Sequence, residues 1–140
     1  MPDLIPYLGF NGNCAEAMRF YERALDGNLE LMMSCGDSPM AAQVPKEFAD
    51  RIMHARLALP GGATLYAGDA MGQTYQGIHG VSITLNYGSV AEAKKIFERL
   101  ADGGKVTMAM ASTFWSKSFG MVTDKFGVHW IVNGELLPIS

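Results

Sequence analysis

The sequence predicts an α+β protein made of two copies of one unit, each with the order strand, helix, strand, strand, strand, or βαβββ. Residues 13–27 and 89–103 both contain Ala-Glu-Ala near their start, an aromatic-Glu-Arg triplet in the middle and Asp-Gly at their end. Strand-forming runs flank both copies in the same order. With 140 residues, 49% of them hydrophobic, the chain has the size of one domain with a buried core. We therefore expect a single domain over residues 1–140, with units at about 1–70 and 78–136.

The first unit opens with an apolar, aromatic run at residues 4–10, which predicts a strand. A helix is expected to begin at Asn13, which has capping-box spacing to Glu16, and to end at Asp26-Gly27. Between these points, apolar residues recur at the spacing of one helix face. The predicted buried face consists of Ala17, Phe20, Tyr21, Ala24 and Leu25.

Three more strands are expected in this unit, at residues 29–35, 52–59 and 63–67. Pro-Gly-Gly separates the last two and predicts a turn between antiparallel neighbours. Residues 36–50 are the longest stretch without periodicity. A loop of this length in a compact domain is often a lid or a binding loop, and disorder is the alternative.

The second unit begins with a strand at residues 81–85, where alternation places Val81, Ile83 and Leu85 on one face. Ser89 and Glu92 have capping-box spacing at the start of the second helix. The buried face of this helix is predicted to consist of Ala93, Ile96, Phe97 and Leu100.

The second unit is completed by strands expected at residues 105–110, 119–123 and 128–133. Residues 124–127 read as the turn between the last two strands. Trp130 alternates with Val128 and Val132 onto one face, so we interpret it as a core residue.

Composition and charge exclude several classes of partner. The net charge is −3, and no run of Lys or Arg is interleaved with aromatic residues, so we expect no nucleic acid partner. The apolar runs are too short for a membrane span, and the start Met-Pro-Asp lacks the features of a signal peptide, so we expect a cytoplasmic protein. Cys14 and Cys35 fit no disulfide framework. Cys14, in the first helical turn, is either a reactive thiol or a packing residue.

Several phrases resemble one family over almost the whole chain: residues 6–14, 36–42, 113–115 and 120–130. They are similar to the vicinal oxygen chelate superfamily, which includes glyoxalase I, bleomycin-resistance proteins and extradiol dioxygenases. Within it they resemble the PhnB-like subgroup, also labelled demethylubiquinone methyltransferase-like. The resemblance implies curved mixed sheets around a cavity, helices on the convex side, and a homodimer. The methyltransferase label gains no support from the residues, because no Gly-rich loop follows a strand to hold a cofactor such as S-adenosylmethionine.

Metal-dependent members of the resembled superfamily take His, Gln or Glu ligands from the first and last strands of each unit. Aligning the helix starts and turns places these positions near Ile5 or Pro6, near Tyr66, near Gly80 or Val81, and near Ile131. None is a good metal ligand, so we expect no standard metal site and no cofactor. A divalent metal in an unusual site is left open, with five candidate ligands: His54, Asp69, His79, His129 and Glu135.

Aromatic residues predict instead a pocket for a small hydrophobic or aromatic molecule. The predicted lining consists of Tyr7, Tyr66, Trp115, Phe119 and His129. Trp115 lies in a connection where nothing in the pattern demands a large side chain. His54 is either an acid or base facing the pocket or a strand-end residue with local hydrogen bonds.

The leading hypothesis is therefore a metal-free protein that binds a small molecule, of the glyoxalase or bleomycin-resistance type. The first alternative is a metal-dependent lyase, isomerase or dioxygenase. A methyltransferase-like enzyme is the remote alternative. The sequence leaves open whether the protein is an enzyme.

Overall fold

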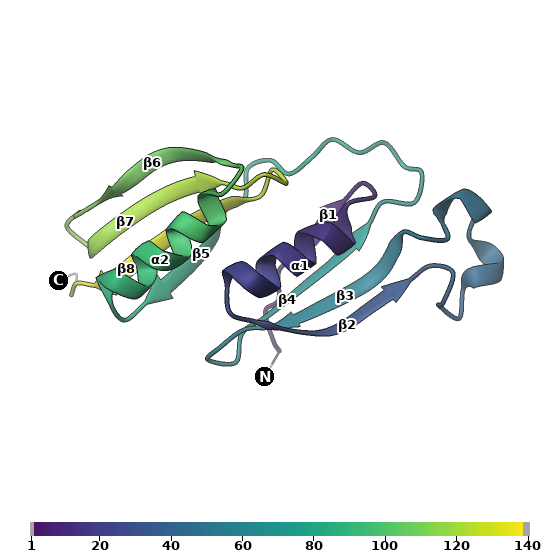
Figure 1. Cartoon of the computed structure of the whole chain (residues 1–140), viewed down its shortest axis with the longest axis horizontal. Helices are drawn as coiled ribbons and strands as arrows, with labels where there is room; N and C mark the ends of the chain where they lie inside the picture. Colours follow the sequence, from purple (N-terminus) through teal and green to yellow (C-terminus); the bar gives the residue numbers. More distant parts are fainter. Residues whose placement is uncertain (1, 139–140) are drawn as a thin grey trace. The chain divides into compact units, whose positions relative to one another are not determined.

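The computed structural model describes residues 2–138 and divides into two compact units between Gly77 and Ile78. We refer to them as the N-terminal and C-terminal units. Each has the order βαβββ and builds its own four-stranded mixed sheet, which confirms the predicted α+β class (Figure 1). Neither α1 nor α2 is long and apolar enough to cross a membrane.

The N-terminal sheet has the strand order β1-β4-β3-β2. β1 runs parallel to β4, and the other neighbours are antiparallel. Helix α1 contacts β2, β3 and β4 and lies on one side of the sheet (Figure 1). The bounds are β1 Tyr7–Phe10, α1 Cys14–Ala24, β2 Asn28–Ser34, β3 Ile52–Ala58 and β4 Thr64–Asp69.

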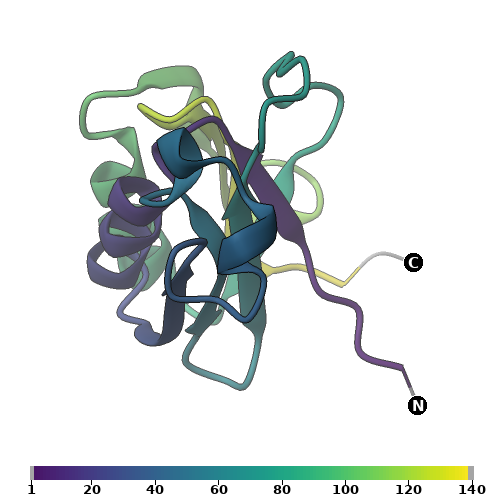
Figure 2. The ribbon, with the colours of Figure 1, turned by 90° about the vertical axis from the view of Figure 1, so that its right-hand side faces the viewer.

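Two details of this unit differ from the prediction. The first strand begins at Tyr7, because residues 2–6 run out from the sheet (Figure 2) and contain Pro2 and Pro6, which have no N–H to donate. The segment 36–50 forms two short 3-10 helices, η1 Ala41–Gln43 and η2 Lys46–Phe48.

Helix α1 is held by the apolar face that its periodicity predicted. All five predicted residues are buried, and Tyr21 is fully so. Against them lie buried residues of the sheet, among them Leu8, Leu57 and Leu65. The predicted capping box is wrong, since Asn13 makes no side-chain cap. At the other end, Asp26 itself adopts the left-handed conformation, with φ of 54°.

The C-terminal sheet has the strand order β5-β8-β7-β6, with β5 parallel to β8 and the other pairs antiparallel. Helix α2 contacts all of its strands. The bounds are β5 Ile83–Tyr87, α2 Val90–Ala101, β6 Lys105–Ala111, β7 Ser116–Thr123 and β8 His129–Leu136. The first strand starts two residues later than predicted, and Val81 is 62% exposed outside it.

Local signals predicted the C-terminal unit well. The Ser89 hydroxyl accepts a hydrogen bond from the backbone N–H of Glu92 at 3.1 Å, which confirms the cap. The predicted face of α2 is buried throughout. Trp130 is a core residue, 1% exposed, and its Nε1 donates to Asp124 Oδ2 at 2.8 Å. The same carboxylate accepts backbone N–H groups of the turn, so Asp124 holds the hairpin between β7 and β8.

Two glycines let α2 approach its sheet. A Cβ on Gly134 would lie 2.9 Å from the Ala93 Cβ, and one on Gly120 would lie 2.7 Å from Phe97 Cε1. Both distances are shorter than van der Waals contact. A side chain at Gly134 would press on the backbone of α2, whereas one at Gly120 would force the Phe97 and Met110 side chains to move.

Candidate functional site

Each sheet has one face under its helix and one that the helix leaves uncovered, which we call the helix-free face. Side chains alternate between the faces along a strand. In the N-terminal sheet the buried Ala55 and Leu57 of β3 face α1, so His54 and Arg56 lie on the helix-free face. Strand pairing sets Tyr66 of β4 opposite Arg56, and Tyr7 of β1 opposite Tyr66.

Three rings meet on this helix-free face, and we call them the ring cluster: Tyr7, His54 and Tyr66. The centroids of His54 and Tyr66 are 4.8 Å apart with an interplanar angle of 78°, an edge-to-face contact. Those of Tyr7 and His54 are 6.0 Å apart at 24°, closer to stacked. Tyr7 is 56% exposed, so a large part of the cluster is accessible. The structure thus brings together two predicted pocket residues and the candidate acid or base.

The position of Tyr7 depends on a glycine. A Cβ on Gly68 would collide with the Tyr7 hydroxyl and would lie 3.0 Å from the carbonyl oxygen of Met53. That hydroxyl donates a long hydrogen bond of 3.4 Å to the same carbonyl. Partial removal from water raises the pKa of the Tyr7 phenol, with smaller contributions from Cys14 and Asp69. Tyr7 is therefore a neutral hydrogen-bond donor at neutral pH.

Arg56 adds a positive charge next to the ring cluster. Its side chain is half-buried, and its Nε is buried without a hydrogen-bond partner in the described part of the chain. The sequence analysis missed this residue. Alternation along β3 was the signal that could have found it, because Arg56 is two residues from His54 and shares its face.

The C-terminal unit holds a second aromatic group, formed by Phe114, Trp115 and Phe119. Trp115 makes edge-to-face contacts with both of the others, at centroid distances of 4.8 and 5.1 Å. Its backbone is fixed, because its N–H donates to Thr113 Oγ1 at 3.3 Å and its carbonyl accepts from the N–H of Leu137 at 2.7 Å. Two predicted pocket residues are therefore in contact, Trp115 on the connection before β7 and Phe119 within β7.

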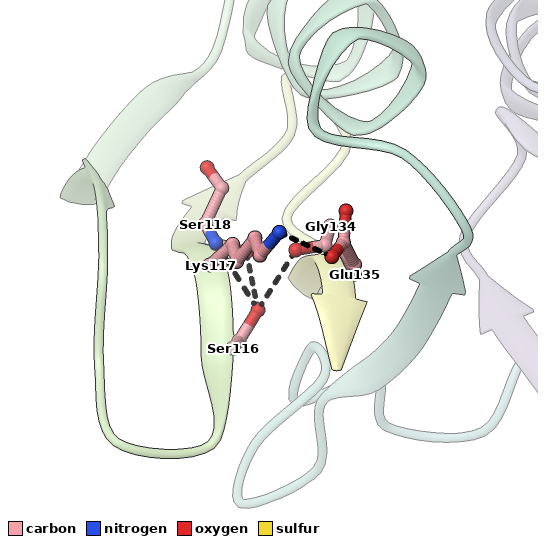
Figure 3. Close-up of polar contacts among 5 residues, drawn as sticks. All are labelled: Ser116, Lys117, Ser118, Gly134 and Glu135. Atoms are coloured by element: carbon pink, nitrogen blue, oxygen red, sulfur yellow. Dashed lines mark hydrogen bonds and ion pairs between the residues drawn. The ribbon is translucent and has the colours of Figure 1, made fainter. Parts of the chain in front are cut away.

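Polar contacts fix the start of β7, where this connection ends (Figure 3). The buried Ser116 hydroxyl lies 2.7 Å from the Ser118 carbonyl oxygen and 3.3 Å from that of Gly134. Beside it, Lys117 Nζ pairs with Glu135 Oε2 at 2.5 Å. Glu135 has φ of 57°, an unusual value for a residue within a strand. The ion pair is solvent-exposed, so its contribution to stability is small.

An amide pair lies beside the second aromatic group. Asn133 of β8 is opposite Phe119 of β7, and its Nδ2 donates to Asn86 Oδ1 at 2.9 Å. Asn133 is 5% exposed, and its Oδ1 has no partner within residues 2–138. Sequence reasoning missed both asparagines, because neither belongs to a motif.

His129, the fifth predicted pocket residue, has both ring nitrogens engaged. Nδ1 lies 2.9 Å from Thr123 Oγ1, and Nε2 lies 3.2 Å from the carbonyl oxygen of Ile78. Because a carbonyl only accepts, Nε2 donates to it, and Nδ1 shares the second hydrogen bond with the Thr123 hydroxyl. His129 thereby ties the segment before β5 to β8.

The metal site of the resembled superfamily can be tested against these positions. Strand pairing sets Tyr7, not Ile5 or Pro6, opposite Tyr66, and sets Thr84, not Gly80 or Val81, opposite Ile131. The pairing therefore adds Tyr7 and Thr84 to the positions that a metal site in these units could use. At these positions the chain offers two phenols, a hydroxyl and an aliphatic side chain, which is a poor ligand set for a divalent ion.

The other candidate ligands do not form a metal centre in the described ranges. Residues 2–138 contain no group of three or more His, Cys, Asp or Glu side chains that could hold an ion. Asp69 uses both carboxylate oxygens for the backbone N–H groups of Gly12, Cys14 and Ile52. Glu135 is paired with Lys117. The side chains present in this part of the chain therefore do not fit a divalent metal ion.

Cys14 is not an activated thiol. It is fully buried, and burial together with the nearby Asp69 charge raises its pKa to about 12. Of the two readings of this residue, the structure supports packing.

A model of a protein family matches most of the chain. The model of the 3-demethylubiquinone-9 3-methyltransferase family matches residues 2–133. The chain belongs to this family. The family's description refers to methyl transfer, yet neither junction between a first strand and its helix carries the Gly-x-Gly-x-x-Gly pattern of a nucleotide-binding turn.

Solved structures share the fold. Protein PA1353 from Pseudomonas aeruginosa is 48% identical, with a TM-score of 0.87 over 95% of this chain and 97% of that one. A putative 3-demethylubiquinone-9 3-methyltransferase, PhnB protein, from Bacillus cereus is 23% identical, with a TM-score of 0.75 over 94% and 98%. A glyoxylase/bleomycin resistance protein/dioxygenase domain from Frankia sp. EAN1pec is 16% identical, with a TM-score of 0.69 over 96% and 98%. The family model confirms the resemblance to demethylubiquinone methyltransferase-like proteins. The last two structures show that the chain shares its fold with a PhnB protein and with a glyoxylase/bleomycin resistance protein/dioxygenase domain.

Proposed function

We propose that this protein binds a small planar organic molecule on the helix-free face of its N-terminal sheet, without a metal. The observation that carries the proposal is the ring cluster, in which three adjacent strands each contribute one ring to the same face. Aromatic side chains offer a planar ligand a large contact area and specific ring-to-ring geometry.

The exposure of the cluster supports a binding role over a purely structural one. Tyr7 is 56% exposed, although it lies over a glycine whose missing side chain makes room for it. Rings that served only to stabilise the sheet would gain more from burial. Exposed aromatic surface next to polar groups is typical of ligand sites.

The aromatic group around Trp115 is a second surface of the same kind, and it supplies an optical reporter. Hydrogen bonds hold the backbone of Trp115 on both sides, and its ring packs against Phe114 and Phe119. We propose that an aromatic compound binding there would change Trp115 fluorescence and that Trp115→Ala would abolish the change.

The direct test of the main proposal is calorimetric titration with 2-naphthamide, a planar and uncharged probe. Tyr66→Ala should weaken binding roughly tenfold, the value of one aromatic contact. Tyr75→Phe is the matched control, because it removes only a hydroxyl that donates to the Gly9 carbonyl at 2.7 Å. Equal binding by the wild type and Tyr66→Ala, or failure of the wild type to bind both this probe and its acidic analogues 2-naphthoate and 2-naphthyl phosphate, would overturn the proposal.

We also propose a cytoplasmic homodimer. The edge strand β6 supports the dimer, because Val106 and Met108 are 44% and 50% exposed on a strand with a free edge. Light scattering in solution tests it: a mass twice that of the chain is expected, and a monomer at all concentrations would contradict it. Cell fractionation tests the compartment, and recovery with membranes or outside the cell would contradict it.

A further inference from the structure

We infer that Arg56 forms an anion-binding subsite next to the ring cluster, so that the ligand is an aromatic acid. This inference rests on the proposed function and adds to it the chemical class of the ligand. The positive charge, its surroundings and the chemistry of the guanidinium support it in turn.

Arg56 is a charge without a partner on a partly covered surface. The side chain is half-buried on β3, and its Nε is buried with no acceptor in reach within the described residues. Withdrawing a charged donor from water is costly unless an acceptor or a counter-charge replaces the water. A ligand with an acidic group would supply both.

The neighbours of Arg56 supply no counter-charge. Tyr66 lies opposite it on β4, and Leu31 lies opposite it on β2. The acid closest to it along β2 is Glu30, an exposed residue at the irregularity between Leu29 and Leu31. Over residues 2–138, no ion pair joins Arg56 to Glu30 or to any other carboxylate. The positive charge is thus available to an added anion.

The chemistry of the guanidinium defines the class of ligand. Its planar fork of N–H donors matches a carboxylate or a phosphate, which it binds through two parallel hydrogen bonds. Because Tyr66 is the direct cross-strand neighbour of Arg56, an acidic group on Arg56 places an attached ring at the ring cluster. The ligand class is therefore an aromatic ring that carries a carboxylate or a phosphate.

The experiment compares three probes with one ring system: 2-naphthoate, 2-naphthyl phosphate and 2-naphthamide. Calorimetry on the wild type should show at least one acid binding roughly tenfold or more tightly than the amide. Arg56→Gln should remove that preference and leave amide binding unchanged. Arg19→Gln is the matched control, because Arg19 is exposed on α1. The two acids distinguish a carboxylate from a phosphate site.

Each outcome decides a separate point. Equal binding of acids and amide by the wild type, or an acid preference that survives in Arg56→Gln, would overturn the anion subsite while leaving the proposed function in place. Failure of all three probes to bind would overturn both. Should Arg56→Gln not fold, Arg56→Lys and the loss of acid binding with added salt decide instead, because a charge contact weakens with ionic strength and an aromatic contact does not.

Discussion

The carboxylate of Asp69, at the end of β4, accepts a hydrogen bond from the backbone N–H of Cys14, the first residue of α1, at 3.1 Å. The same oxygen accepts from the N–H of Gly12 at 2.8 Å, and the other oxygen accepts from that of Ile52 at 2.8 Å. A negative charge at the positive end of the helix is favourable in addition to these bonds. Asp69 therefore caps α1 from a neighbouring strand.

Loss of this carboxylate should destabilise the protein. Asp69→Ala leaves three backbone donors without a partner, and we expect the free energy of unfolding to fall by about 2–3 kcal/mol. Asn13→Ala is the control, with an effect within about 0.5 kcal/mol, because Asn13 makes no cap. Urea denaturation measures both. A larger effect for Asn13→Ala than for Asp69→Ala would contradict the assignment.

The raised pKa of Cys14 predicts a pH dependence of stability. The thiol has a pKa of about 12 in the folded protein and 9.0 in the unfolded chain, so between these values the folded state holds a proton that the unfolded state has released. The contribution of the Cys14 thiol to the stability of the folded protein is complete below pH 9.0 and is lost as the pH rises to about 12. Stability should fall across this window.

The measurement is the difference in the free energy of unfolding between the wild type and Cys14→Ala at each pH. The variant is needed because Tyr7 and Tyr75 also have raised pKa values and contribute in the same direction. The wild type should lose more stability than the variant between pH 9 and pH 11. A thiol reagent at pH 8 gives a second readout, with reaction at Cys14 only on unfolding. Rapid modification of Cys14 in the folded protein would contradict this account.

The helix caps show which features the sequence could predict. The cap at Ser89 was predicted because donor and acceptor lie three residues apart, and the structure has that bond. The cap of α1 was not, because Asp69 is 55 positions from Cys14 in the chain, and only the pairing of β1 with β4 brings them together. Asn13 has the residue type and the spacing of a cap, but it makes no side-chain cap hydrogen bond.

The candidate site likewise combines features that the sequence could predict with features that it could not. Residue type was enough to single out Tyr7, Tyr66 and His54. Their contact, however, follows from the strand register, because a shift of one residue would move a ring to the other face of the sheet. Register also shows that Tyr66 pairs with Tyr7, which the sequence could not reveal. Arg56 could have been found by alternation alone.

Gly68 provides a test of the ring cluster that changes none of its rings. A Cβ there would displace Tyr7, so Gly68→Ala should weaken binding of 2-naphthamide several-fold while the fold persists. Gly9→Ala is the matched control, because a Cβ on this β1 residue meets no atom within 4 Å. Calorimetry checks both variants. Equal loss in the two, or no loss in Gly68→Ala, would count against a role for Tyr7.

Divalent metals should not stabilise the protein. A folded state with a competent site would gain stability from nickel, zinc or manganese by mass action. Because the aligned strand positions carry no good ligands, we expect the melting temperature to stay unchanged with each ion and with a chelator. A saturable rise with any of these ions would contradict the metal-free proposal and favour the enzyme alternative.

The most direct test of the central claim is NMR of the three histidine rings during titration with 2-naphthoate. His54 contacts both tyrosines of the ring cluster, so its ring signals should shift in proportion to occupancy. Tyr66→Ala should reduce the shift, and Arg19→Gln should preserve it. Binding of the probe with no change at His54 would contradict the claim that the helix-free face of the N-terminal sheet is the ligand site.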